Sequence, residues 1–446
     1  MTLTLDRIDR KFYTNPDRSD VPTTADVVVI GGGIAGPAAS WALDRLSPGI
    51  KTVLIEKGSQ LASGASTASI ENFRSAWPTE CLARMMTRSI NVLLNADEYL
   101  GEGAESALNV RQRGYLYCGF NDEDAKDLQA SVAQLNNIGL PHVEYLEADE
   151  VAYRYPWLKG RVVAAKFDPM AGWIDSNALA NAYAKMAESA KFLLEMENTE
   201  IIVENSKVVG VKTSGGVIST SNVVIAAGPG SRQIANTAGI DIPIVVRPRQ
   251  SFTTKWRHED FPGDSPFIIG AHPSSYVRPE AQDGAIFGWE YKIKTEHGAE
   301  NAEDFMEYPD GHADEHKDAR FPSLTLNGLA KQFSYEDSEG FNDTKYMAGL
   351  THRAGYYVYR HPETTYKSDS KTGERKNYDS ERAIIDACPG IDGLFLSVAH
   401  VGHGIMSSPA AAEILAAHVL GQEMPDPLFL QFGINVPYVE NDGGGL

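Results

Sequence analysis

The sequence predicts an α/β protein with two domains, one built on a parallel sheet and the other on a mostly antiparallel sheet. Three observations support this fold class. An apolar strand pattern runs through a glycine-rich turn into a helix pattern over residues 27–43. The same order of strand, glycine turn and helix returns over residues 394–420. Between them, residues 247–382 alternate strand patterns with long polar loops, which is typical of an antiparallel sheet.

The first of these patterns has the form of a nucleotide-binding turn. Val27 to Ile30 form an unbroken apolar run, as expected of a strand buried on both faces of a parallel sheet. The glycines that follow match G-x-G-x-x-G: the first permits the turn, the second lets a pyrophosphate approach the backbone, and the third lets helix and strand pack closely. Free N–H groups at the helix start then face the phosphates. The residues predicted to hold a dinucleotide here are Gly31, Gly33, Ile34, Ala35 and Gly36.

A second strand pattern, Thr52 to Ile55, ends at an acidic residue of the kind that binds an adenosine ribose. Glu56 stands twenty residues after Gly36, where its carboxylate can accept hydrogen bonds from both ribose hydroxyls and disfavours the 2′-phosphate of NADP. The loop that follows, residues 60–78, is rich in small residues, which indicates backbone close to a ligand. Contacts predicted in this region are Glu56, Lys57, Ser63, Ala65 and Ser66.

Later elements continue the α/β pattern. Turn chemistry before Asp175 and Ser176 predicts a helix start there. A strand from Val223 to Ala227 ends in a small-residue turn at Gly228, so Ala227 and Gly228 are also predicted cofactor contacts. The C-terminal strand and glycine turn lead into a helix that we expect to be amphipathic.

Composition and charge exclude several classes of function. The 446 residues suffice for two domains, and 60 acidic against 40 basic residues leave a net charge of −20, which argues against nucleic-acid and anionic-membrane partners. Three widely spaced cysteines argue against structural disulfides and a thiolate zinc site. No apolar run has the length of a signal-peptide core or a membrane span, so we expect a cytoplasmic protein with a short N-terminal arm before the first strand.

Two charged segments, 294–320 and 360–382, are poor in apolar residues and are predicted to be surface insertions or mobile loops. His312 and His316 in the first segment have the i,i+4 spacing of a zinc-binding helix. They lack the H-E-x-x-H order and lie in a hydrophilic stretch, so no metal site is predicted.

Four separated stretches resemble the D-amino acid oxidase superfamily of FAD-dependent oxidoreductases, which includes glycine oxidase, sarcosine oxidase and D-amino acid dehydrogenase. They read "VVVIGGGIAGPAASWAL…VLIEKG", "ASGAST", "DPMAGWIDSNALANAY" and "PGIDGLFLSVAHVGHGIMSSPAAAEILA", with support from "VVIAAGPGS" and "SYVRPEAQDGAIFG". The resemblance implies a discontinuous Rossmann-like FAD domain and a substrate domain whose antiparallel sheet roofs the flavin. The expected boundaries are 1–105, 155–240 and 383–446 for the FAD domain, and 106–154 and 241–382 for the substrate domain.

The resemblance also gives a role to the C-terminal glycine turn. In the family this turn lies near the isoalloxazine ring, where N–H groups at a helix start stabilise negative charge on reduced flavin. It therefore implies flavin contacts at Gly402, His403, Gly404, Ile405 and Met406. Non-covalent FAD is expected, because Cys388 lies away from the segment that carries the covalent cysteine in sarcosine oxidase-like members, and loop 60–78 lacks the histidine used by dimethylglycine dehydrogenase-like members.

The implied reaction is hydride transfer from the carbon beside the nitrogen of an amino acid or a secondary or tertiary amine to flavin N5, giving an imine. Oxygen or another acceptor would then take the electrons. A second possibility with the same fold is oxidation of a 2-hydroxy acid, which would want a base such as His352 or His400. A third is a non-catalytic flavoprotein that assists assembly, as some relatives do.

Substrate recognition departs from the family pattern. Many members place an arginine directly after a "GL" strand to pair with a substrate carboxylate, whereas this chain has Thr351 there. Arg353, two residues on, would keep the same strand face and is either a replacement or a surface ion-pair partner, while His352 should point the other way. Tyrosines 356, 357 and 359 could form an aromatic cage or simply pack the strand. The substrate-side candidates are Arg74, Tyr276, Arg278, Arg353, Tyr357 and His400.

Overall fold

The computed structural model describes residues 11–14, 16, 20–158, 160–271, 274–289, 313–333 and 340–442. Seven of the described strands form a sheet in the order β1-β9-β3-β2-β13-β22-β21, parallel except for β21 against β22. These strands are β1 (Phe12–Thr14), β2 (Val27–Ile30), β3 (Thr52–Ile55), β9 (Lys191–Leu194), β13 (Val223–Ile225), β21 (Ile384–Ala387) and β22 (Leu394–Val398). The predicted strands at 27–30 and 52–55 are confirmed. The N-terminal arm adds an edge strand, β1, that was not expected.

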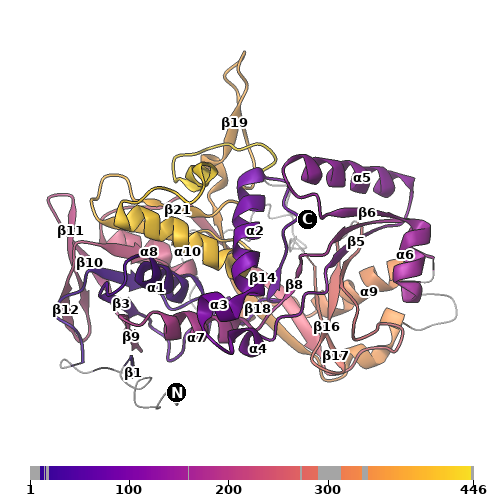
Figure 1. Cartoon of the computed structure of the whole chain (residues 1–446), viewed down its shortest axis with the longest axis horizontal. Coiled ribbons are helices and arrows are strands. Elements are labelled where there is room, and N and C mark those ends of the chain that lie inside the picture. The colour runs from indigo at the N-terminus through magenta and orange to yellow at the C-terminus, as the bar shows by residue number, and fades with distance from the viewer. Residues whose placement is uncertain are drawn as a thin grey trace.

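Helices bring the C-terminal segment back against the N-terminal glycine turn, because α1 packs against both α7 and α10 (Figure 1). The described helices in the region of the parallel sheet are α1 (Ala35–Leu46), α2 (Glu80–Leu94), α3 (Ala96–Leu100), α4 (Ala104–Leu108), α7 (Ser176–Met186), α8 (Ser231–Thr237) and α10 (Gly404–Leu420). Helix α7 begins as predicted: the side chain of Asp175 accepts a hydrogen bond from the backbone N–H of Ala178.

The prediction of an amphipathic C-terminal helix is wrong. Helix α10 is buried continuously from Ile405 to Ala417, because α1, α2 and the sheet all pack around it. Its one buried carboxylate, Glu413, forms ion pairs with Arg45 (2.6 Å) and Arg88, which lie on α1 and α2. We expected one apolar face on this helix, whereas it is apolar nearly all round.

Eight described strands form the second sheet, in the order β18-β14-β17-β16-β15-β5-β7-β6, and of these pairs only β15 with β5 is parallel. The strands are β5 (Tyr115–Gly119), β6 (Glu144–Glu147), β7 (Ala164–Asp168), β14 (Ile244–Thr254), β15 (Phe267–Ile269), β16 (Tyr276–Glu280), β17 (Gly284–Gly288) and β18 (Thr351–Arg360). Helices α5 (Asp122–Asn137), α6 (Ala148–Arg154) and α9 (Phe321–Phe333) pack on it. The predicted fold class is confirmed.

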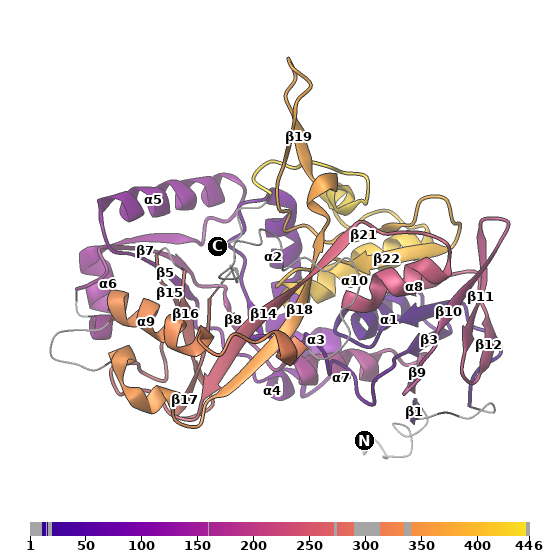
Figure 2. The same cartoon turned by 180° about the vertical axis from the view of Figure 1, so that it is seen from behind.

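The long strands β14 and β18 run from one sheet region to the other (Figure 2). Ile244 and Val246 at one end of β14 pack with the strands of the parallel sheet, whereas Phe252 at the other end lies in the core of the second sheet. The domain boundaries stay a prediction. Strand β7 belongs to the second sheet although its residues fall in the stretch 155–240 assigned to the FAD domain.

Smaller sheets complete the described structure. They are β10 (Glu200–Glu204), β11 (Lys207–Thr213) and β12 (Gly216–Ser219); β4 (Asn72–Phe73) with β8 (Gly172–Trp173); and β19 (Tyr366–Ser368) with β20 (Arg375–Asn377). Among the described residues, none of the helices has the length and apolarity to cross a membrane, and no group of acidic, histidine or cysteine side chains could hold a metal ion.

The prediction for the charged segments is partly confirmed. The β19–β20 hairpin projects from the body of the molecule, and its strand residues are mostly exposed (Figures 1 and 2). Its flanks are not surface, because Arg360 and Arg382 are buried. In the other segment His316 ends a short 3-10 helix, whereas residues 294–312, including His312, lie outside the described residues.

Candidate active site

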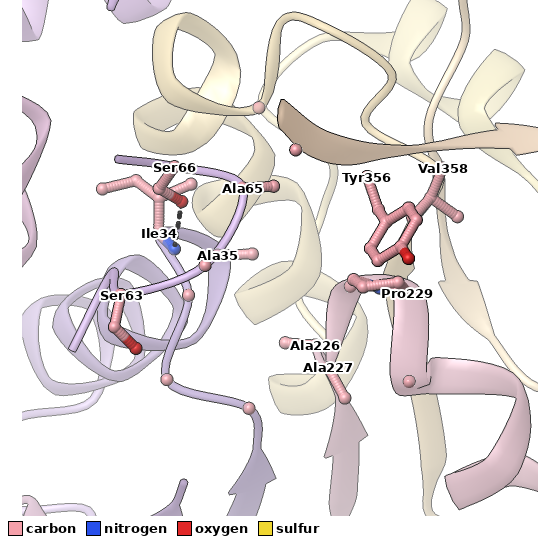
Figure 3. A pocket seen from close by; sticks show the side chains of 18 of the residues that line it. Ile34, Ala35, Ser63, Ala65, Ser66, Ala226, Ala227, Pro229, Tyr356 and Val358 are labelled. Atoms are coloured by element: carbon pink, nitrogen blue, oxygen red, sulfur yellow. Dashed lines mark hydrogen bonds between the residues drawn. The ribbon is translucent and has the colours of Figure 1, made fainter. Parts of the chain in front are cut away.

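A cavity of about 1030 Å³ lies where the carboxyl ends of the parallel strands meet β18. Its walls are the glycine turn after β2, the loop 63–69, the turn 226–230, residues 353–358 of β18 and the segment 397–405. Figure 3 shows the loop and the start of α1 on one side, with Pro229, Tyr356 and Val358 on the other. The volume is at the upper end of the range for small-molecule sites.

The glycine turn has the backbone that a pyrophosphate requires. Gly31 has φ +117°, and a Cβ there would lie 2.4 Å from the carbonyl oxygen of Ala226. A Cβ on Gly36 would lie 1.9 Å from the oxygen of Gly31, so this glycine packs helix on strand and does not line the cavity. A Cβ on Gly33 would meet nothing within 4 Å. Gly33 therefore leaves open the space into which a pyrophosphate would fit.

The start of α1 is tied to the small-residue loop. The backbone N–H of Ile34 donates to Ser66 Oγ at 3.3 Å (Figure 3). Ser63, Ala65 and Ala35 also line the cavity. The structure thus places this loop beside the glycine turn, and its predicted contacts with a cofactor stay a prediction.

Glu56 lines the cavity directly after β3, and its carbonyl oxygen accepts a hydrogen bond from the backbone N–H of Met196 at 2.9 Å. Its carboxylate oxygens accept hydrogen bonds from the backbone N–H groups of Gly32 (2.5 Å) and Gly58 (2.6 Å). Each oxygen can accept a further bond, so the carboxylate remains able to bind ribose hydroxyls. Lys57, Ala227 and Gly228 line the cavity as well.

Tyr357, His400 and Gly402 also line the cavity, and the last two follow β22, which is separated from β2 by β13 in the sheet. A Cβ on Gly402 would lie 2.6 Å from the Tyr357 ring, so glycine permits this close contact. His400 is partly buried: its Nε2 pairs with Ser397 Oγ at 3.0 Å, and its Nδ1 has no hydrogen-bond partner among the described residues. Burial, and then the nearby His403, lower the pKa of His400 to about 3.

The remaining residues of the C-terminal turn divide into two groups. Gly404 and Ile405 line the cavity, whereas His403 and Met406 are buried outside its lining. His403 donates from Nε2 to the carbonyl oxygen of Glu381 at 2.6 Å and packs edge-on against Trp77. Burial lowers the pKa of His403 to about 4, and the Arg74 charge adds to this effect.

Arg74 is buried outside the cavity lining. It donates to Tyr117 Oη at 2.7 Å, and its guanidinium lies 3.9 Å from the centre of the Trp77 ring. Trp77 in turn touches His403. Arg74 is therefore two side chains away from the C-terminal turn at residues 402–404.

Arg278 and Tyr276 are also outside the lining. Arg278 is almost fully buried and donates to the carbonyl oxygen of Ile70 (2.8 Å), to Asn72 Oδ1 (3.0 Å) and to Glu280. The bonds to Ile70 and Asn72 anchor the segment that leads into β4, and the bond to Glu280 holds the end of β16. The Tyr276 ring lies over Gly288, where a Cβ would be 2.3 Å away.

Residues of β18 alternate as predicted. Arg353 is exposed, lines the cavity and donates to the carbonyl oxygen of Thr67 at 3.4 Å. His352 points to the opposite face, where its Nε2 pairs with Gln250 Oε1 at 3.0 Å and its ring stacks on Phe321. Tyr356 lines the cavity together with Tyr357, whereas Tyr359 is buried beneath Arg247.

A buried polar cluster beside Arg74 escaped the sequence analysis. Lys166 Nζ lies 4.1 Å from the centre of the Tyr117 ring and donates to Ser131 Oγ at 3.1 Å. Burial, and then the Arg74 charge, lower the pKa of Lys166 to about 8. The antiparallel pairing of Tyr117 with Lys166 creates this neighbourhood, so no local motif announces it.

Cys388 is buried in the core and does not line the cavity. Burial raises the pKa of its thiol to about 11. No cysteine stands among the described residues of the lining.

A family model described as FAD dependent oxidoreductase matches residues 26–418. Sarcosine oxidase subunit beta of Rhizobium meliloti (strain 1021) is 27% identical over 280 residues, covering 59% of this chain and 63% of that relative, less than two thirds of its length. FAD-dependent oxidoreductase domain-containing protein 1 of Xenopus laevis is 23% identical over 436 residues, covering 89% of this chain and 79% of that relative.

Solved structures share the fold. L-proline dehydrogenase from P. horikoshii matches with a TM-score of 0.73 and 23% identity, covering 93% of this chain and 98% of that one. Glycine oxidase from Geobacillus kaustophilus matches with a TM-score of 0.71 and 19% identity, covering 92% of this chain and 98% of that one.

Proposed function

The chain belongs to the FAD-dependent oxidoreductase family, and from this premise we propose that it oxidises an amino acid or a secondary or tertiary amine at the carbon beside the nitrogen. The names of its relatives support this substrate class: they include sarcosine oxidase subunit beta and 4-methylaminobutanoate oxidase. Bound FAD would supply the chemistry by accepting a hydride at flavin N5. The protein then has to bind, orient and enclose the reactants.

The observation that carries the proposal is the order of groups along the cavity. The strands β3, β2, β13 and β22 are neighbours in this order, and residues after each of them line the cavity. Glu56 follows β3 and suits an adenosine ribose, Gly33 follows β2 and leaves space for a pyrophosphate, and His400 follows β22. In this arrangement the N–H groups at the starts of α1 and α10 offer positive dipole ends to an anion.

We propose that FAD is held without a covalent bond. The described cavity lining lacks a cysteine, and Cys388 packs in the core with a thiol whose pKa is raised to about 11. Hydrogen bonds from the glycine turn and to Glu56 would then account for retention of the cofactor.

The surroundings of the two candidate bases, His400 and His352, support an amine substrate better than a 2-hydroxy acid. Removing a hydride from an alcohol carbon requires a base for the hydroxyl proton, whereas a neutral amine uses its own lone pair. The pKa of His400 is lowered to about 3, so this histidine is a weak base and serves better as a neutral hydrogen-bonding group. His352 faces away from the cavity and pairs with Gln250.

We propose that Arg353 and Arg74 supply positive charge for the substrate carboxylate, with Arg353 as the stronger candidate. Arg353 lines the cavity, whereas Arg74 is one layer behind it, next to Trp77 and His403. Arg278 donates hydrogen bonds to Ile70, Asn72 and Glu280. We therefore propose that it positions the segment before β4.

Anaerobic bleaching of the yellow protein tests the proposal. The panel is sarcosine, glycine, L-proline, 4-methylaminobutanoate and matched 2-hydroxy acids, with absorbance of oxidised flavin as the signal. Reduction by one of the amines and by none of the hydroxy acids is the expected result. Reduction by hydroxy acids alone would assign the alternative reaction. FAD binding without reduction by any panel member, or by other amines and amino acids, would favour the non-catalytic alternative.

A further inference from the structure

A fully buried ion pair anchors the C-terminal end of the described chain. Arg382 and Asp442 form this pair, and both side chains have 0% exposure. The Asp442 carboxylate also accepts hydrogen bonds from Ser380 Oγ (2.7 Å) and from the backbone N–H of Glu381 (3.0 Å). We call the group Ser380, Glu381, Arg382 and Asp442 the C-terminal clasp.

The clasp is connected through Glu381 to the C-terminal turn of the cavity, residues 402–404. Asp442 holds the N–H of Glu381, and the carbonyl oxygen of Glu381 accepts the hydrogen bond from His403 Nε2 at 2.6 Å. His403 is the N-cap of α10, and its neighbours Gly402 and Gly404 line the cavity. Two hydrogen bonds thus link the clasp to this turn.

Arg360 at the end of β18 joins this strand to the same group. It donates to the carbonyl oxygens of Arg382 (2.9 Å), Ala383 (2.7 Å) and Phe432 (2.9 Å). Residues 356–358 of the same strand line the cavity beside the C-terminal turn, because the backbone N–H of Val401 donates to the carbonyl oxygen of Val358 at 3.0 Å. The clasp is therefore linked both to the C-terminal turn, through His403, and to the strand beside that turn, through Arg360.

A buried ion pair is a poor device for stability alone, because the cost of removing both charges from water offsets their attraction. Its donors and acceptors do impose directions, since Arg382 also donates to the carbonyl oxygens of Gln431 and Val436. The directions that these hydrogen bonds impose explain the buried Arg382–Asp442 pair better than a gain in stability does.

We propose that Asp442 and Arg382 are positioning residues for the flavin-side turn: they orient Glu381, which orients His403 and the start of α10 against the cofactor. This inference rests on the proposed FAD site. Neither residue touches the cavity, and neither is a catalytic residue.

The test compares Asp442→Asn with Asp386→Asn. Asp386 also anchors the C-terminal segment, because it accepts a hydrogen bond from the backbone N–H of Ile434 at 2.9 Å, but it is not part of the clasp. Three properties are measured: the dissociation constant of FAD from titration of the apoprotein, the visible spectrum and reduction potential of the bound flavin, and the Tm of the apoprotein.

We expect Asp442→Asn to weaken FAD binding by at least about tenfold and to shift the flavin spectrum and potential, because the α10 N–H groups no longer meet the flavin in the same place. Asp386→Asn should change the Tm of the apoprotein and leave the flavin properties as in the parent. Equal flavin properties in parent and Asp442→Asn would overturn the inference.

Two further variants keep the test decisive where Asp442→Asn does not fold. Ser380→Ala removes one hydrogen bond to Asp442 and keeps the ion pair, and the double variant Arg382→Met/Asp442→Leu replaces the pair by apolar groups. Both should shift the flavin spectrum, and an unshifted spectrum in folded protein would count against positioning. If the parent itself binds no FAD, the proposed function fails instead, so the two failures are distinguishable.

Discussion

At the residue scale, two glycines of one turn have opposite surroundings and therefore predict opposite phenotypes. Gly33→Val places its side chain in open space, so the apoprotein should keep its Tm while FAD binding is lost. Gly36→Ala places a Cβ against the backbone oxygen of Gly31 and should lower the free energy of unfolding by more than about 2 kcal/mol. Thermal unfolding of both apoproteins and FAD titration of Gly33→Val check the pair. Retained FAD affinity in Gly33→Val would contradict the pyrophosphate assignment.

Arg353 offers the most direct test of a substrate carboxylate, because it is a cavity-lining cation on the sheet face. Arg353→Met should lower kcat/KM at least about tenfold for a substrate with a carboxylate, and by less for its uncharged analogue. Arg74→Met is the companion variant, and a smaller direct effect is expected because Arg74 lies behind Trp77. Arg375→Met on the exposed hairpin is the matched control. Unchanged kinetics in both test variants would point instead to recognition by the tyrosines of β18.

Lys166 predicts a pH dependence of stability. Its pKa is lowered from 10.5 to about 8 in the folded protein, so between these values the unfolded chain binds more protons and stability rises with pH. Below pH 8 the folded protein bears the cost of a buried charge. Lys166→Met should therefore be the more stable protein at pH 7.5, by about 1 to 3 kcal/mol, and its advantage should shrink toward pH 10. Urea unfolding of both proteins at the two pH values measures this difference. A difference independent of pH would show that the Lys166 pKa is not lowered.

Local sequence was enough to predict the positions of residues that depend on a backbone motif, whereas their contacts with a cofactor stay a prediction. Gly31, Gly33 and Glu56 follow from a motif in which spacing along the chain determines position in space. Tyr117 and Lys166 do not, because they meet only through the pairing of β5 with β7. The substrate-side arginines were placed by resemblance, and the structure puts Arg278 in an anchoring network that its short motif does not reveal.

At the element scale, α10 depends on a single buried carboxylate that joins it to α1 and α2. Glu413→Gln keeps the shape but removes the charge that pairs with Arg45 and Arg88. We expect a loss of about 1 to 3 kcal/mol in the free energy of unfolding, because both arginines remain partly solvated. Glu80→Gln breaks an exposed i,i+4 pair with Arg84 and should cost less than about 0.5 kcal/mol. Chemical denaturation of the two variants separates them, and equal losses would refute the distinction.

The error over α10 has a physical cause. A helix that packs on one layer shows a polar stripe, and the prediction assumed one layer. Helix α10 instead lies among α1, α2 and the sheet, and its alanines and serines allow close approach on several sides. The surroundings of a helix depend on elements distant in the chain, so its burial could not be deduced from its own period. Flanks 360 and 382 of the charged insertion were misjudged for the same reason, since their arginines are buried by the C-terminal segment.

At the scale of the whole molecule, the cavity takes its walls from both sheets and from segments distributed between residues 30 and 405. The resemblance to the D-amino acid oxidase superfamily implied an antiparallel sheet over the FAD domain, and the parallel sheet accounts for the rest because it brings its carboxyl ends to one edge. The contacts across the two regions were not predictable, since the long strands β14 and β18 take part in both cores.

A ligand that binds such a junction stabilises the whole fold, and this gives the last prediction. Free FAD at about one hundred times its dissociation constant should raise the free energy of unfolding by about 2.7 kcal/mol, and the Tm should rise with FAD concentration because the binding is reversible. Acid precipitation of the yellow protein should then release the flavin into the supernatant, since the described lining offers no cysteine for a thioether. Colour that stays in the precipitate, together with a Tm independent of added FAD, would demonstrate a covalent link. A histidine of the lining, His400, would then be the first residue to examine by peptide mapping.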